Sequence, residues 1–150
     1  MKRAVFPGSF DPITLGHCEI IVKACEIFDE VIVSVGNNIQ KKYMFSIDQR
    51  LNFISQEFKS NSKVLVEKYE GLTVDFCKSK NVKHMIRGLR NPADFEFEKK
   101  IALFNKSLEN TETIFLLTSP NNAFISSSMV REIMENGGNY KKFVPNSVTV

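Results

Sequence analysis

The sequence has little cysteine and histidine and no long apolar run. The three cysteines, Cys18, Cys25 and Cys77, form no CxxC pair, and an odd number argues against a disulfide framework. Two histidines are too few for a Cys/His zinc site, so we expect no protein-bound metal. No apolar run approaches the ~20 residues that a membrane-spanning helix needs. These absences predict a reduced, cytoplasmic protein that does not enter a membrane.

The sequence also lacks GxxxxGK[ST] and GxGxxG, which disfavours a P-loop NTPase and a standard dinucleotide dehydrogenase. Charge of one sign is scarce, because the net charge is only +3 and lysines and acids are interspersed. A nucleic-acid binder would carry a dense basic stripe, so nucleic acid is not an expected partner. The charge balance is compatible with a small anionic substrate.

Short β-branched runs alternate with segments of helical period along the whole chain. The runs predict strands over residues 3–6, 30–35, 63–69, 82–86 and 113–117. The periodic segments predict helices over residues 16–28, 46–58, 72–80, 92–108 and from 126 or 127 to about 137. Ser46 with Gln49 is a capping box, and Asn91-Pro92 is a typical helix start. Five β–α units predict an α/β fold: a single Rossmann-like domain over residues 1–150, with a doubly wound five-stranded parallel sheet in the order 3-2-1-4-5.

Groups suited to phosphate follow four of the five predicted strands. In such a sheet, ligands bind beyond the carboxyl ends of the strands, where the strand order reverses. These loops carry Ser9 and His17, then Lys41, then Arg87 to Arg90 around an expected glycine turn, then Ser126 to Ser128. Each group alone has an ordinary explanation in solubility, ion pairing or helix capping. Their shared position at one end of the sheet favours a phosphate-handling site.

Residues 8–17, Gly8-Ser9-Phe10-Asp11-Pro12 and Thr14-Leu15-Gly16-His17, resemble the GxFDPxTxGH signature of the HxGH nucleotidyltransferases. Thr14 replaces the first histidine, which is the form usual in bacterial phosphopantetheine adenylyltransferases. Further matches follow in the expected order and cover most of the chain: Lys41 with Met44-Phe45, residues 86–90, residues 93–98 and residues 124–128. Ser9 replaces the more usual threonine, Tyr43 stands where proline is common, and Asn122 stands where an aromatic residue is often found.

The resemblance implies transfer of the adenylyl group of ATP to 4′-phosphopantetheine, giving dephospho-coenzyme A and pyrophosphate in coenzyme A biosynthesis. It also implies Mg²⁺ with ATP, and a homohexamer. By the same resemblance, the catalytic residues are Ser9, His17, Lys41 and Arg90, and the phosphopantetheine ligands are Ser9, Lys41, Thr73 and Arg87. The implied ATP-binding residues are Ser9, Phe10, His17, Gly88, Leu89, Arg90, Glu98, Asn122, Ala123, Phe124, Ile125, Ser126, Ser127 and Ser128.

Two alternatives remain open. The first is another adenylyl- or cytidylyltransferase of the same superfamily, acting on nicotinamide mononucleotide or glycerol 3-phosphate. Thr14 and the ISSS run disfavour a cytidylyltransferase, which typically keeps the first histidine. The second is a non-catalytic protein that binds adenine nucleotides. The joint presence of His17, Lys41, Arg87 and Arg90 argues against it, because binding alone does not require the whole set.

Overall fold

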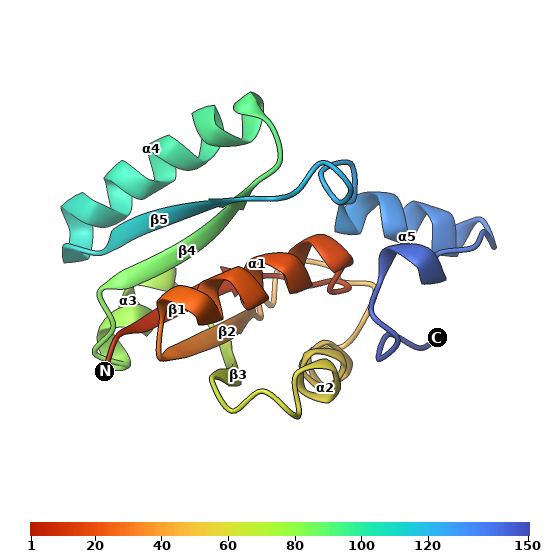
Figure 1. The fold of residues 1–150 in the computed structure, drawn as a ribbon, viewed down its shortest axis with the longest axis horizontal. Helices are drawn as coiled ribbons and strands as arrows, with labels where there is room; N and C mark the ends of the chain where they lie inside the picture. Colours follow the sequence, from red (N-terminus) through yellow and green to blue (C-terminus); the bar gives the residue numbers. More distant parts are fainter.

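The computed structural model describes all 150 residues and contains a five-stranded, all-parallel sheet. The strands are β1 (Arg3–Gly8), β2 (Glu30–Gly36), β3 (Val64–Tyr69), β4 (His84–Leu89) and β5 (Glu112–Leu117). Their order is β3-β2-β1-β4-β5, which confirms the predicted topology. The strand order therefore reverses between β1 and β4 (Figure 1).

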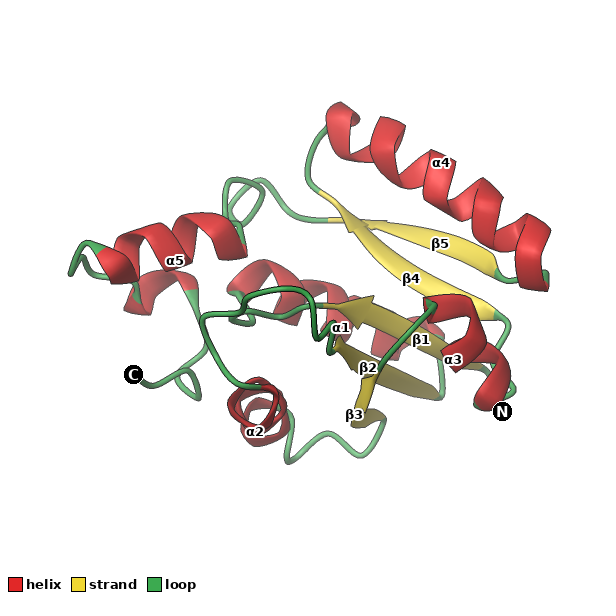
Figure 2. Cartoon of the chain, turned by 180° about the vertical axis from the view of Figure 1, so that it is seen from behind, coloured by secondary structure: helices red, strands yellow, loops and turns green.

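The chain has five helices, and helices lie on both faces of this sheet (Figures 1 and 2). They are α1 (Leu15–Ile27), α2 (Ile47–Glu57), α3 (Thr73–Ser79), α4 (Pro92–Glu109) and α5 (Ser127–Glu135), followed by a 3₁₀ turn, η1 (Lys141–Phe143). Side chains of α1, α2 and α5 share one buried cluster with β1 and β2, whereas α3 packs on the opposite face. None of the helices has the length and apolar character needed to cross a bilayer.

Local sequence determines where the helices that border the loops begin. Ser46 and Gln49 form the predicted capping box of α2, and the Asn91 side chain caps α4 with Pro92 in its first turn. Ser126 caps α5 by accepting a hydrogen bond from the Met129 amide. Because each cap satisfies an amide that would otherwise lack a partner, the loops at this end of the sheet have defined endpoints.

The prediction that β4 ends at Ile86, before a glycine turn, is wrong. β4 continues to Leu89, because β5 pairs with it along its full length, including Gly88 with Leu116. Gly88 is instead required by close packing against α1. A Cβ atom at Gly88 would lie 2.9 Å from Cγ1 of Ile20, which is buried.

The sheet opens at the point where its order reverses. β1 pairs with β2 at six positions, but with β4 only at Val5 and Met85 (Figure 1). Nearer the carboxyl ends, the Arg87 side chain crosses between the two strands, and its Nη1 donates to the Pro7 carbonyl at 2.7 Å. Here a hydrogen bond from the Arg87 side chain replaces the backbone hydrogen bonds that would otherwise join β1 and β4.

Gly88→Ala should lower the free energy of unfolding by about 1–3 kcal/mol, the usual cost of overpacking a filled site. Urea denaturation of a double-mutant cycle with Ile20→Ala measures the coupling. In the Ile20→Ala background the added methyl group meets less side chain, so the substitution should cost less. Equal costs in both backgrounds would contradict this explanation.

Candidate active site

Two cavities open at the carboxyl end of the sheet and share a wall. The first cavity, of about 320 Å³, extends from β1 toward α1, the end of β4 and the start of α5. The second cavity, of about 650 Å³, extends toward the loop after β2, α3 and α4. Both are lined by Pro7, Gly8, Ser9 and Arg87. Two ligands bound in these cavities would therefore meet at Ser9 and Arg87.

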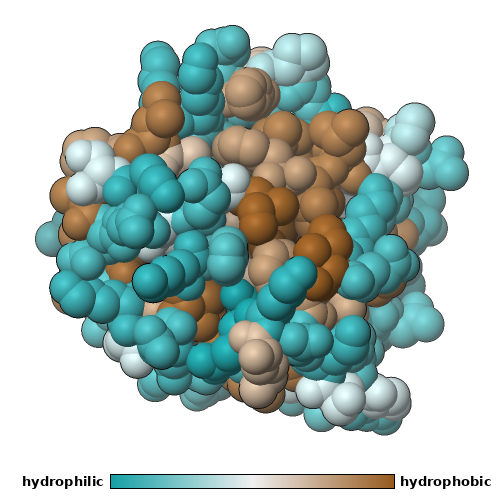
Figure 3. All heavy atoms as spheres, turned by 60° about the vertical axis from the view of Figure 1, so that its left-hand side comes forward, coloured by the Kyte–Doolittle hydropathy of each residue, from teal (hydrophilic) through white to brown (hydrophobic).

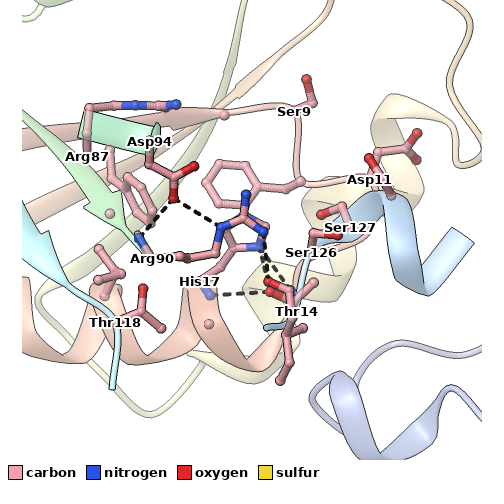
Figure 4. Close-up of a pocket in the computed structure, with 18 of the residues that line it drawn as sticks. Ser9, Asp11, Thr14, His17, Arg87, Arg90, Asp94, Thr118, Ser126 and Ser127 are labelled. Carbon is pink, nitrogen blue, oxygen red and sulfur yellow. Dashed lines mark hydrogen bonds and ion pairs between the residues drawn. The ribbon is translucent and has the colours of Figure 1, made fainter. Parts of the chain in front are cut away.

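His17 lies in the first turn of α1 and lines the first cavity (Figure 4). The Thr14 amide donates to His17 Nδ1 at 3.0 Å, so a neutral ring carries its proton on Nε2. Burial, assisted by the charges of Arg87 and Arg90, lowers the pKa of His17 from 6.5 to about 4. The imidazole is therefore neutral at pH 7 and has one N–H to donate to a ligand.

The loop that follows β1 is held in one conformation. Both carboxylate oxygens of Asp11 accept backbone hydrogen bonds at 2.9 Å, from Met44 and Phe45. Phe10 has a φ of 47°, in the left-handed region that a bulky residue rarely adopts. Its buried ring packs against His17, with 4.9 Å between the ring centroids, and against Gly8, where a Cβ atom would lie 3.0 Å away. Gly8 is therefore needed to make room for this ring.

The sequence did not reveal Arg50, although it organises the same loop. Its side chain is 1% exposed and donates to the carbonyls of Ser9 (2.8 Å), Gly36 (2.9 Å) and Phe45 (3.1 Å). One cation thus joins the loops after β1 and β2 to the start of α2. The sequence feature that could have indicated this role is that Arg50 shares the apolar face of α2 with Phe53 and Ile54.

Lys41 lines the second cavity, and its Nζ donates to Ser9 Oγ at 3.2 Å. Tyr43, at the position where proline is common, fixes this loop through its ring. The Tyr43 hydroxyl accepts from the Asn38 amide at 3.0 Å, and its ring centroid lies 3.8 Å from Arg50 Cζ and 5.3 Å from Lys41 Nζ. The loop is thus restrained by stacking and hydrogen bonding.

Two of the predicted phosphate ligands form ion pairs. Arg87 and Glu98 make a bidentate pair, with N–O distances of 2.9 and 2.7 Å, and Glu98 is 8% exposed. Arg90 pairs with Asp94 at 3.3 Å (Figure 4). Glu98 lines the second cavity and not the first, so its contact with ATP stays a prediction. The carboxylates fix both guanidinium groups in place and offset their charge.

The three serines at the start of α5 line the first cavity beside Ile125. Ser126 caps the helix, and Ser127 Oγ donates to the Pro12 carbonyl at 2.8 Å. Ser128 Oγ accepts from Nη2 of Arg131 at 3.2 Å. Arg131 also lines the cavity and was missed by the sequence analysis. It lies three residues after Ser128, a spacing that puts both on one helix face.

Most predicted site residues line one of the two cavities, but four line neither: Leu89, Asn122, Ala123 and Phe124. Asn122 Nδ2 instead donates to Glu19 at 2.8 Å, and Glu19 also accepts from the amide of Ser119 at 2.8 Å. Burial alone would raise the pKa of Glu19, but hydrogen bonds from Asn122, Lys23 and Ser119 outweigh burial and lower it to about 2. Glu19 thus anchors the loop that leads to Ser126.

Comparisons with known proteins match most or all of the chain. The family model described as cytidylyltransferase-like matches residues 5–133. The phosphopantetheine adenylyltransferase of Flavobacterium psychrophilum is 54% identical over 100% of this chain and 99% of its own. The protein of the same name from Frankia alni is 43% identical over 99% of this chain and 94% of its own.

A solved structure shares the fold at low sequence identity. It is a bifunctional NMN adenylyltransferase/ADP ribose pyrophosphatase from Francisella tularensis, complexed with AMP and a manganese ion. It matches with a TM-score of 0.71 and 18% identity, over 97% of this chain. This chain spans less than half of that protein, 45% of its length.

The position of His17 predicts a pH dependence of stability. Its pKa of about 4 in the folded chain lies below the ordinary 6.5, so the unfolded state binds more protons between these values. The free energy of unfolding should therefore fall as pH decreases from 6.5 to 4, by at most about 3 kcal/mol from this residue. His17→Gln should flatten that slope in urea denaturation. A slope unchanged in His17→Gln would refute this.

Proposed function

The chain belongs to the cytidylyltransferase-like family and, within it, to the phosphopantetheine adenylyltransferases, and on this basis we propose how its two cavities perform adenylyl transfer. The reaction moves the adenylyl group of ATP to 4′-phosphopantetheine and yields dephospho-coenzyme A and pyrophosphate. The observation that carries the proposal is the shared wall at Ser9 and Arg87, since transfer requires two substrates to meet there.

The chemistry needs alignment and charge neutralisation more than acid–base catalysis. A phosphate monoester is already a nucleophile at pH 7, so it attacks the α-phosphorus of ATP without a general base. Two polyanions must be brought together against their repulsion, and the charge on the transferring group must be stabilised. We propose direct in-line attack, with the Nε2–H of neutral His17 as a donor to the α-phosphate. No covalent adenylyl-enzyme forms in this scheme.

We assign ATP to the first cavity and phosphopantetheine to the second. The ATP ligands would include Ser9, Phe10, His17, Arg90 and the run from Ile125 to Ser128. In the second cavity, Lys41, Ser9 and Arg87 would bind the acceptor phosphate, and Thr73 would line the path of the pantetheine arm. Both assignments are supported by which side chains line each cavity.

Magnesium would enter as MgATP. No group of three His, Cys, Asp or Glu side chains is arranged to hold a metal ion. The two carboxylates beside the first cavity are occupied: Asp11 accepts backbone amides and Asp94 pairs with Arg90. The triphosphate and water would therefore supply most ligands of the ion.

Free cysteines, at Cys18, Cys25 and Cys77, favour action in the reducing cytoplasm.

We further propose that α4 packs against other copies of the chain in a homohexamer. Glu98 is the only buried residue among the 18 of α4. Phe97 (65% exposed), Ile101 (41%), Phe104 (64%) and Leu108 (46%) follow one another at helical spacing. Apolar side chains gather on the side of the molecule where α4 lies (Figure 3), and such patches mark association surfaces.

Pyrophosphate release from MgATP tests the function directly. We expect release with 4′-phosphopantetheine and none with nicotinamide mononucleotide. Release only with the second acceptor would keep the superfamily and change the substrate. ATP binding without release for either acceptor would favour a binding-only protein.

His17→Ala should reduce kcat by about 10²–10³-fold, with little change in the KM for ATP, because the lost hydrogen bond strengthens in the transition state. Steady-state kinetics with both substrates measures the split. A raised KM with unchanged kcat would remove His17 from the catalytic role.

Phe104→Asp should yield particles smaller than a hexamer in light scattering, since burying an unpaired carboxylate opposes association. Lys99→Asp introduces the same side chain on a different side of α4 and should leave the assembly intact. A hexamer that survives Phe104→Asp would exclude this face as the interface.

A further inference from the structure

Two contacts hold the Lys41 side chain at the second cavity. The side chain is exposed, and its Nζ donates to Ser9 Oγ at 3.2 Å. Nζ also lies 5.3 Å from the centroid of the Tyr43 ring, within the range of a cation–π interaction. A free lysine side chain samples many rotamers, so each of these contacts favours one position of the ammonium group.

The Tyr43 ring packs on a cation that is itself held in place. Arg50 Cζ lies 3.8 Å from the ring centroid, a stacking that suits the planar guanidinium group. The Arg50 side chain is 1% exposed and donates to the carbonyls of Ser9, Gly36 and Phe45. Because these three bonds fix the guanidinium group, they also fix the surface on which the Tyr43 ring stacks.

The hydroxyl of Tyr43 is bound to the turn that carries Lys41. It accepts from the Asn38 amide at 3.0 Å, and the Asn38 carbonyl accepts from the Lys41 amide at 3.0 Å. The amide of Gln40 donates to Asn38 Oδ1, also at 3.0 Å. The turn from Asn38 to Lys41 is thus connected to Arg50 through one aromatic side chain.

Arg50 therefore holds both groups that would meet the acceptor phosphate. It binds the backbone of Ser9 directly, and it holds the Lys41 turn through Tyr43. The contact between Lys41 Nζ and Ser9 Oγ depends on both attachments. Loss of the Tyr43 ring would release the Lys41 turn and leave Ser9 in place.

We propose that Tyr43 is a positioning residue for the acceptor phosphate, and that it acts by holding Lys41 beside Ser9 before the substrate binds. This inference rests on the proposed assignment of phosphopantetheine to the second cavity. A preorganised ammonium group loses less rotamer freedom on binding and so contributes more affinity. Tyr43 lines the second cavity and not the first, so it should matter for phosphopantetheine and not for ATP.

Calorimetric titration with each substrate alone tests the assignment. Tyr43→Leu removes the aromatic face and should weaken binding of 4′-phosphopantetheine about 5- to 30-fold. Binding of the Mg²⁺ complex of α,β-methylene-ATP should stay the same. Tyr43→Phe keeps a ring on Arg50 and should recover most of the loss. A phenylalanine variant as weak as the leucine variant would contradict the role of the stacked ring.

A double-mutant cycle separates positioning from direct contact with the substrate, because Tyr43 itself lines the second cavity. In a Lys41→Met background, Tyr43→Leu should cost little further affinity for phosphopantetheine, since the group that it positions is gone. Equal costs in both backgrounds would overturn the proposal. An equal loss of both substrates in Tyr43→Leu, or no loss of either, would overturn it as well.

Tyr140→Leu is the matched control. Tyr140 is partly buried at the start of η1 and lines neither cavity. The same substitution there should leave both dissociation constants unchanged. A wild-type protein that binds phosphopantetheine without turnover would reject the proposed function, whereas a selective loss of that binding in Tyr43→Leu would still assign Tyr43.

Discussion

The guanidinium group of Arg87 lies where β1 and β4 cease to pair, and it binds both sides of the gap. Nη1 donates to the Pro7 carbonyl on β1, while Nε and Nη2 hold the Glu98 carboxylate on α4. A continuous ladder here would close the sheet, and an apolar side chain would leave the Pro7 carbonyl without this donor. Arg87 keeps the gap open and gives the Pro7 carbonyl a hydrogen-bond donor. Because Arg87 lies in this gap, it forms part of the wall that the two cavities share.

The loops beside this gap are held mainly by contacts between backbone and charged side chains. Arg50 donates hydrogen bonds to three backbone carbonyls, and Asp11 accepts hydrogen bonds from two amides of the loop before α2. Such contacts fix the backbone of the loops beside the two cavities. Among the cations that line the cavities, Lys41 and Arg131, one in each cavity, form no ion pair.

Much of this arrangement could be predicted from the chain itself. Hydrophobic periodicity and the caps at Ser46, Asn91 and Ser126 indicated the elements, and the alternation of strand and helix indicated the topology. The extension of β4 could not be predicted, because the residues that lengthen it lie on β5 and the reason for Gly88 lies on α1. Arg50 was missed for a similar reason: its acceptors are backbone carbonyls, which leave no mark in the sequence.

Helix α4 is attached to its own domain in an unusual way. The one residue that it buries is Glu98, and that residue holds Arg87. The ion pair between Glu98 and Arg87 therefore both holds α4 on the sheet and positions Arg87 in the gap between β1 and β4. Breaking this pair would destabilise the packing of α4 and the shape of the gap together. In an isolated copy of the chain, α4 buries little besides Glu98, and so it would belong to the less stable end of the protein's range of local opening. Departure of α4 would remove the partner of Arg87, and the acceptor site would be lost in the same event.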